Sequence, residues 1–185
     1  TLMDAAHLAY SAAKLPPGME PGLHERAAFV PMGATFPNGC HVCEVEIDPD
    51  DGSIRVIRYI VVDDVGTVMN PLLLKGQIHG GIAQGVGQIL MEDITWDPDS
   101  AQQLSGSFMD YCMPRASDFP FFDVVSNPVP TALNPLGIKG AGEAGTVGAM
   151  PCLMNAIVDA LVQRGVHHLD MPATPARVWH AIQNA

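Results

Sequence analysis

Basic residues are scarce in this chain: 9 Lys and Arg stand against 20 Asp and Glu in 185 residues, which gives a formal net charge of −11. A surface this acidic repels phosphate backbones, so we expect no nucleic-acid partner. Long apolar runs are also lacking, because glycine, lysine or proline interrupts them before they reach membrane-spanning length. Residues 1–14 lack the basic start and cleavage site of a secretion signal. These absences predict a soluble, cytoplasmic protein with no membrane span.

Cysteine is scarce as well, with four residues at positions 40, 43, 112 and 152. Four thiols in a chain of this length do not form a disulfide framework, which fits a reducing compartment. Cys40 and Cys43 have the CxxC spacing of metal and redox sites, but they lie in a stretch predicted to be a strand. Residues three apart in a strand point to opposite faces, and no second CxxC follows. We therefore predict a structural role for both and no metal site.

Length and hydrophobic patterning predict one α+β domain over residues 1–185, with a mixed sheet and packed helices. A capping-box pattern at Thr1 and Asp4 begins the first helix, and Thr174 with Pro175 begins the last. Two longer helices are predicted over 71–92 and 146–164. Strands are predicted at six places, the second and third of which form a hairpin: 27–31, 39–48, 53–63, 93–96, 106–111 and 121–126.

The predicted helix over 71–92 carries a stripe of amides. Gln77, Gln84 and Gln88 are spaced seven and four residues apart, which places them on one face. The same helix contains five glycines, each of which costs about 1 kcal/mol relative to alanine, so some close approach must offset them. One interpretation is a row of amides that reads a heterocycle or a cofactor tail. The other is a tightly packed helix whose polar stripe faces solvent.

A glycine-rich run over 137–148 places a single acid, Glu143, just before a helix. Glycine lets the backbone approach a ligand closely, so Glu143 is a candidate working group beside a bound cofactor. Alternatively, an acid at this position simply interacts with the free N–H groups of the first helical turn. The run also contains a formal G-x-G-x-x-G at Gly140, Gly142 and Gly145, but a proline-punctuated loop precedes it where a dinucleotide site needs a buried strand.

Other polar residues near these motifs have two readings each. Lys139 is either a surface charge or a partner that holds Glu143 ionised. Asp63 and Asp64, at a strand end, have the residue type of metal ligands, but without further ligands a solvated turn is the better prediction. His79 is either a ligand or a packing residue, and because it lies near the apolar side of its helix, a packing residue is predicted.

Five segments together resemble one family. They are TFPNGCHV at 35–42, VDDVGTVMNP at 62–71, GQIHGGIAQG at 76–85, SFMDY at 107–111 and KGAGE at 139–143. In this order they are similar to the C-terminal part of the molybdopterin-binding large subunit in the xanthine dehydrogenase, aldehyde oxidase and carbon monoxide dehydrogenase family. The resemblance spans essentially all 185 residues.

The resemblance implies roles for particular residues. Glu143 matches the glutamate of the family's Gly-Glu motif, a general base that takes a proton from the oxygen that attacks the substrate carbon. Gln77 matches a glutamine that hydrogen-bonds molybdopterin. Gln84, Gly142 and Gly145 are assigned to the cofactor site because they lie beside these positions. Lys139 matches a position next to the site, and no role follows for it.

The resemblance also implies what surrounds the chain. The family's large subunit has an earlier region with further cofactor contacts and the substrate pocket, so this chain corresponds to roughly the final quarter and is expected to be inactive alone. The implied cofactor is molybdopterin with molybdenum, as the cytosine dinucleotide form, with [2Fe-2S] and FAD on partner subunits and a small-molecule substrate. Two alternatives remain: a non-catalytic assembly module of such a complex and a dinucleotide-binding domain.

Overall fold

The computed structural model describes all residues from Thr1 to Ala185, as two compact units, Thr1–Met32 and Gly33–Ala185. The single domain expected over 1–185 stays a prediction. In the first unit, α1 covers Leu2–Ala9 and is followed by the short 3-10 helix η1, Ala12–Lys14. The predicted capping box is confirmed: the Thr1 hydroxyl accepts from the Asp4 amide, while the Asp4 carboxylate accepts from the Thr1 amine and hydroxyl.

The second unit contains a mixed sheet of three strands, β1 (Asn38–Ile47), β2 (Ile54–Asp64) and β3 (Phe122–Ser126), in the order β1-β2-β3. β1 and β2 form the predicted antiparallel hairpin, and β3 runs parallel to β2. The predicted α+β class is therefore confirmed. The alternating pattern identified β1 and β2 because their inward residues face one helical layer and their outward residues do not.

The strands predicted at 27–31, 93–96 and 106–111 are wrong. Residues 27–31 have no hydrogen-bonded neighbour strand within their own unit. In the long connection after α2, local hydrogen bonds replace strand pairing: the Asp97 carboxylate accepts from the Ser100 amide, and the Ser107 hydroxyl bonds the Asp110 carboxylate. Only a single bridge forms there, between Trp96 and Gln103. Short polar side chains that bond the nearby backbone favour turns over strands.

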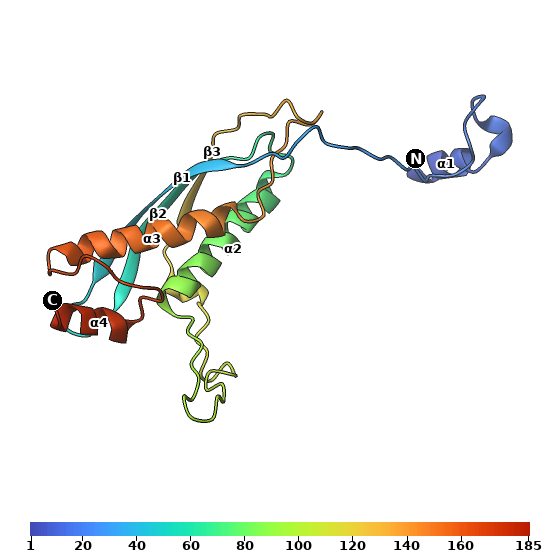
Figure 1. Cartoon of the computed structure of the whole chain (residues 1–185). Coiled ribbons are helices and arrows are strands. Elements are labelled where there is room, and N and C mark those ends of the chain that lie inside the picture. The colour runs from blue at the N-terminus through green and yellow to red at the C-terminus, as the bar shows by residue number, and fades with distance from the viewer. The chain divides into compact units, whose positions relative to one another are not determined.

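Three helices complete this unit: α2 (Pro71–Leu90), α3 (Ala144–Val162) and α4 (Pro175–Gln183), with a short 3-10 helix, η2 (Ala116–Asp118), in the connection. α2 and α3 lie side by side over the inward face of the sheet (Figure 1). Their apolar faces and that of the sheet form one core, whose largest fully buried members are Tyr59, Ile78, Ile82, Ile89, Leu153, Ile157 and Leu161. Helix α3 is also long and apolar enough to span a membrane, but its packing against α2 and β1 accounts for that composition.

Glycines allow α2 and α3 to approach each other closely. A Cβ atom on Gly145 would lie 2.6 Å from the Ile78 carbonyl oxygen, and one on Gly81 would lie 2.9 Å from the Thr146 nitrogen. Both distances are shorter than real Cβ contacts, so only glycine fits. Gly76 and Gly80 differ, because a Cβ on either meets no atom within 4 Å. Helix packing therefore explains part of the glycine content of α2, and an open surface remains beside the rest.

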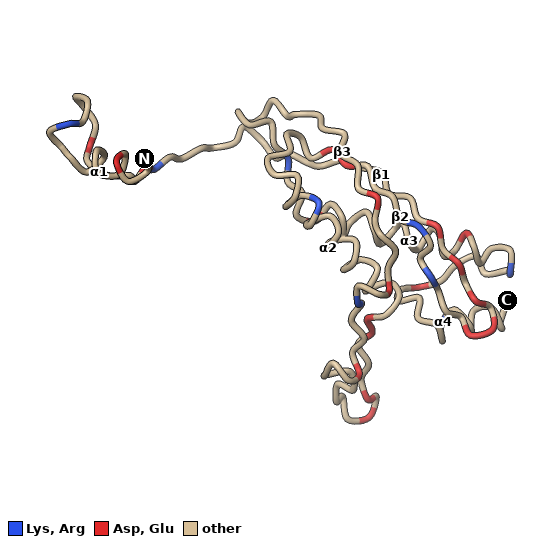
Figure 2. Tube along the Cα trace, turned by 180° about the vertical axis from the view of Figure 1, so that it is seen from behind, with Lys and Arg blue, Asp and Glu red and all other residues tan.

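The hairpin turn between β1 and β2 carries three acids, Asp48, Asp50 and Asp51, which lie at the same end of the unit as α4 (Figure 2). Gly52 in this turn has a φ of 75°, and a Cβ there would lie 2.1 Å from the Pro175 carbonyl oxygen. The acidic turn thus packs directly on the first turn of α4.

Candidate functional site

The loop before α3 is fastened to the end of β2. Gly66 and Ile138 form a bridge, and the Lys139 amide donates to the Val65 carbonyl at 2.9 Å. Gly66 has a φ of 66°, and a Cβ on it would lie 2.2 Å from the Gly137 carbonyl oxygen. Glycine is therefore needed at position 66 for this close crossing of the two backbones. Their contact brings the KGAGE segment next to the VDDVG segment.

An ion pair reinforces the crossing. Lys139 Nζ lies 2.5 Å from Asp64 Oδ2, and Asp64 Oδ1 accepts from the amides of Gly66 and Val129 at 2.8 and 2.9 Å. The Lys139 ammonium, followed by the two amides, lowers the pKa of Asp64 to about 2. Lys139 thus pairs with Asp64, and neither reading offered for it from sequence, a surface charge or a partner of Glu143, is correct.

The solvated turn predicted for Asp63 and Asp64 is also wrong. The Asp64 side chain is 12% exposed and ion-paired, and the Asp63 side chain is 4% exposed and turned toward His41. Strand register explains the difference: Asp63 continues the inward series of Tyr59 and Val61, so it points to the helical layer. No group of three or more metal-ligating side chains occurs in the structure.

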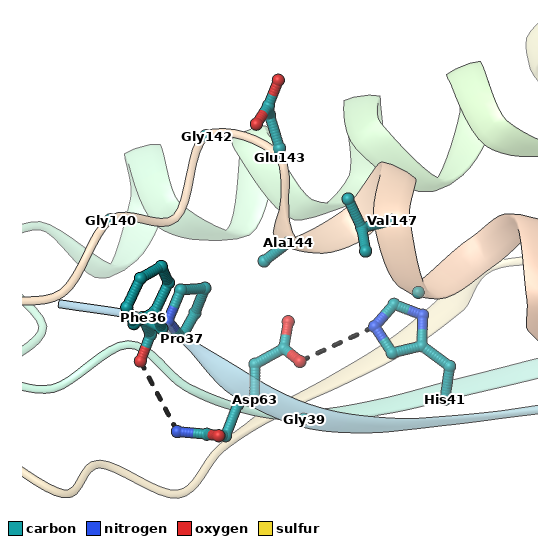
Figure 3. A pocket seen from close by; sticks show the side chains of 12 residues that line it. Phe36, Pro37, Gly39, His41, Asp63, Gly140, Gly142, Glu143, Ala144 and Val147 are labelled. Carbon is teal, nitrogen blue, oxygen red and sulfur yellow. Dashed lines mark hydrogen bonds and ion pairs between the residues drawn. The ribbon is translucent and has the colours of Figure 1, made fainter. Parts of the chain in front are cut away.

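Glu143 is the N-cap residue of α3, and its side chain makes no capping hydrogen bond. Its carboxylate is exposed, and in Figure 3 it points away from Asp63 and His41. The alternative in which Glu143 serves to cap its helix therefore lacks the side-chain bond that a cap makes. An exposed carboxylate with no protein partner is available to accept a proton.

Gln77 and the loop meet directly. Gln77 Nε2 donates to the Gly142 carbonyl at 2.8 Å, so α2 holds the residue that precedes Glu143. Gln84, two turns further along, accepts from the Thr146 hydroxyl at 3.5 Å. The structure thus brings together the residues predicted for the cofactor site, with one difference. Gly145 is buried between the helices, so its Cα packs against α2 and does not face an open surface.

The surface beside Gln77 has room for a broad ligand. A Cβ on Gly140 or Gly142 of the loop, or on Gly76 or Gly80 of α2, would meet no atom within 4 Å. The exposed amide of Gln77 lies among these glycines. Bare backbone next to an amide that both donates and accepts fits a polar heterocycle such as a pterin.

Sequence reasoning missed a second feature of the site. A cavity of about 510 Å³ lies between the Gly140–Ala144 loop, the start of β1 and the end of β2, and Glu143 is among the residues that line it (Figure 3). Its polar lining includes His41 and Asp63, which we had not selected as site residues. The available signal was the alternation of β1 and β2, which places both side chains on the inward face.

A glycine loop held between a sheet end and a helix, with amides and a free acid around bare backbone, defines a cofactor-binding domain. The family model described as "Molybdopterin cofactor-binding domain" matches residues 1–120. The chain belongs to this family, and the resemblance to the molybdenum large subunits of xanthine dehydrogenase and carbon monoxide dehydrogenase is confirmed.

Among curated relatives, the carbon monoxide dehydrogenase large chain of Hydrogenophaga pseudoflava is 37% identical over 183 residues, covering 99% of this chain and 22% of that protein. The nicotine 6-hydroxylase large subunit of Paenarthrobacter nicotinovorans is 35% identical over 182 residues, covering 98% of this chain and 22% of that subunit. The chain therefore spans about a fifth of the length of these relatives.

Solved structures agree. The reconstituted CO dehydrogenase from Oligotropha carboxidovorans matches with a TM-score of 0.86 and 33% identity, over 100% of this chain and 22% of that one. Quinoline 2-oxidoreductase from Pseudomonas putida 86 matches with a TM-score of 0.85 and 38% identity, over 95% of this chain and 22% of that one. Proteins whose names state different substrates thus share this domain.

Proposed function

We propose that this chain forms one wall of the molybdenum cofactor site in an oxidoreductase that oxidises a substrate carbon with oxygen from water, and that Glu143 is its general base. The observation that carries the proposal is the position of Glu143: its carboxylate is exposed and uncapped, one residue after a loop that Gln77 holds. A helix-entrance acid without an internal partner, beside a surface of bare glycine, has the environment of a catalytic group.

In this proposal Gln77 and Gln84 bind the cofactor through their amides, and Gly142 lets it approach the backbone. Gly145 contributes to the cofactor site indirectly, because it lets α3 pack closely against α2. The cofactor is molybdopterin, in its cytosine dinucleotide form, and it supplies the oxidising metal. Glu143 accepts the proton that the attacking water oxygen gives up, and the Gln77 contact to the Gly142 carbonyl holds the base in place. Proton uptake at a fixed carboxylate lets the oxygen attack as a stronger nucleophile.

The remaining parts of the site come from elsewhere in the assembly. Since the chain spans about a fifth of its relatives' length, we propose that the rest of the molybdenum subunit completes the cofactor site and the substrate pocket. Electrons leave through an iron-sulfur subunit with [2Fe-2S] and a flavin subunit with FAD, and the chain alone is inactive. The substrate is a small molecule, and the assembly is cytoplasmic.

A second candidate is a non-catalytic assembly module, favoured by the apolar side chains at the start of α2. Met69, Leu72 and Leu73 are 64, 80 and 69% exposed, respectively. Exposed apolar side chains in a cluster mark a contact surface. This candidate requires that Glu143 be dispensable for turnover, so one variant separates the two functions.

The test is Glu143→Gln in the complete assembly, with turnover and molybdenum content measured together. Loss of a general base lowers the rate by about 100-fold or more, while the amide keeps the size of the side chain and leaves molybdenum in place. Glu44→Gln, the same change on the outward face of β1, is the matched control and retains activity. Turnover of Glu143→Gln within a few-fold of the unmodified enzyme, at equal molybdenum content, rejects the base assignment.

A further inference from the structure

The cavity behind the Glu143 loop contains a carboxylate that the protein leaves incompletely paired. Asp63 is 3% exposed as a residue, and its Oδ2 atom is buried with no hydrogen-bond partner. Its other oxygen, Oδ1, lies 3.6 Å from His41 Nε2. Burying a charged oxygen without a partner is costly, because the lost hydration is not replaced. The arrangement therefore lacks a donor at Oδ2.

The surrounding backbone is shaped for this pair of side chains. A Cβ atom on Gly39 would lie 1.9 Å from Asp63 Oδ1, and one on Gly148 would lie 2.4 Å from His41 Nε2. Neither position accepts a side chain while Asp63 and His41 stay where they are. Gly39 in β1 and Gly148 in α3 thus leave the space that the side chains of Asp63 and His41 occupy.

The contact with Tyr59 determines which ring nitrogen of His41 carries the proton. The Tyr59 hydroxyl lies 2.6 Å from His41 Nδ1, and burial raises the pKa of Tyr59 above its usual value, so the hydroxyl keeps its proton. We assign the hydroxyl as the donor to Nδ1, which leaves the ring proton on Nε2. Nε2–H therefore faces Asp63 Oδ1, and Oδ2 remains free for a second donor.

The missing donor does not come from a basic side chain of the site. Lys139, in the neighbouring loop segment, is held by Asp64. The rest of the cavity is lined by small residues, by Phe36, Pro37 and Val147, and by Asn38 and Glu143, and the Glu143 carboxylate points away from Asp63 (Figure 3). A volume of about 510 Å³ falls in the range of small-molecule sites, roughly 300–1,000 Å³. Such a cavity suits a flat cation whose N–H groups reach a carboxylate while its other surfaces contact apolar atoms.

We propose that Asp63 and His41 form a binding subsite for a guanidinium or amidinium group, at the end of the cavity away from the carboxylate of Glu143, which also lines it. Planar cations of this type donate in a fixed direction to carboxylate oxygens, so one N–H pairs with Oδ2 and the ring of Phe36 covers the plane. The group comes either from a free small molecule or from an arginine in the remainder of the subunit. The subsite does not depend on the catalytic role of Glu143.

The test is a titration of the 185-residue chain with benzamidine at neutral pH, followed by amide NMR shifts. We expect saturable shifts around Gly39, Asp63 and Gly148, and Asp63→Asn weakens binding at least about tenfold because the amide lacks the charge. Asp123→Asn, the same change on an exposed acid of β3, leaves binding within about twofold. A folded chain that shows no saturable shifts at these residues overturns the proposal.

Two further measurements make the result interpretable. Phe36→Ala removes an exposed ring without touching the core, so it tests the subsite if Asp63→Asn fails to fold; equal binding by Phe36→Ala and the unmodified chain contradicts the proposed geometry. Repeating the titration on the complete assembly identifies the source of the group. Binding that persists there indicates a free small molecule, and binding seen only in the separate chain indicates an arginine of the remaining subunit.

Discussion

Gln77 Nε2 lies 2.8 Å from the carbonyl oxygen of Gly142, so a side chain of α2 holds the backbone directly before Glu143. The two residues are 65 positions apart in the chain. This bond gives Gln77 a definite task in the protein itself, in addition to the cofactor contact proposed for it. Removing the amide therefore has two separable effects, one on the loop and one on the cofactor.

We predict that Gln77→Ala loosens the loop with little loss of overall stability. An exposed hydrogen bond contributes about 0.5–1.5 kcal/mol, so the free energy of unfolding falls by no more than that, while amide exchange at residues 140–143 becomes faster. In the complete assembly, molybdenum content per complex decreases. Gln88→Ala, from the same stripe of α2, is the control and changes neither quantity. Unchanged molybdenum content with a weaker complex favours the assembly-module function.

The close contact of α2 and α3 predicts opposite effects at two adjacent glycines. Gly81→Ala forces a Cβ to within 2.9 Å of the Thr146 nitrogen, and we expect about 1–3 kcal/mol of destabilisation from this overpacking. Gly80→Ala meets open space and gains helix propensity, so it stabilises by up to about 1 kcal/mol. Urea unfolding of both variants measures the difference. Equal effects at the two positions contradict the helix contact as described.

Acid stability depends on Asp64. Its pKa in the folded chain is about 2, below the ordinary value of 3.8, because Lys139 and two amides favour the carboxylate. Ionisation therefore stabilises the folded chain fully above about pH 4, and this contribution is lost as the pH falls through about 2. We expect Asp64→Asn to be less stable at neutral pH and to lose less stability on acidification.

The measurement is urea unfolding at several pH values between about 6 and 2. Asp123→Asn, on the exposed face of β3, serves as the control for removing one carboxylate from an acidic chain. An acid-induced loss of stability in Asp64→Asn as large as that of the unmodified chain means that other carboxylates dominate the effect.

Tyr59→Phe tests which atoms donate and which accept in the hydrogen bonds among Tyr59, His41 and Asp63. The change removes the hydroxyl that bonds His41 Nδ1 and leaves that nitrogen without its donor. We expect a loss of about 1–3 kcal/mol in the free energy of unfolding. Nitrogen-15 NMR of the unmodified chain shows Nε2 protonated and Nδ1 accepting, and Tyr59→Phe shows a mixture of tautomers. A proton found on Nδ1 in the unmodified chain contradicts the assigned tautomer of His41.

Local patterns in the sequence were enough to predict the hairpin, the two long helices and the capping box of Thr1. They failed at 93–96 and 106–111, where polar side chains bond the nearby backbone instead of leaving it to a strand. The pairing of Lys139 with Asp64 was also missed, because 75 residues separate the partners and only the folded crossing brings them together. Glu143 and Gln77 were selected from the glycine-rich run and the amide stripe, which left two interpretations open for each, and only the family resemblance implied a particular role.

Asp63 and His41 show a different limit of sequence reasoning. Strand alternation placed them on the inward face, but an acid at a strand end has the same residue type whether it faces solvent or a cavity. The glycines at 39 and 148, which make the space for this pair, are distant in the chain and come from different elements. Such a complementary fit is visible only once β1 and α3 are packed.

The loop that carries Glu143 is tethered on two sides, to β2 through Lys139 and to α2 through Gly142. The distance between the sheet and the helix layer therefore determines the position of the Glu143 carboxylate. Core substitutions far from the loop that thicken or thin this layer displace the carboxylate without altering its chemistry. The alignment of the base proposed at Glu143 thus depends on the dimensions of the hydrophobic core as well as on the residues of the site.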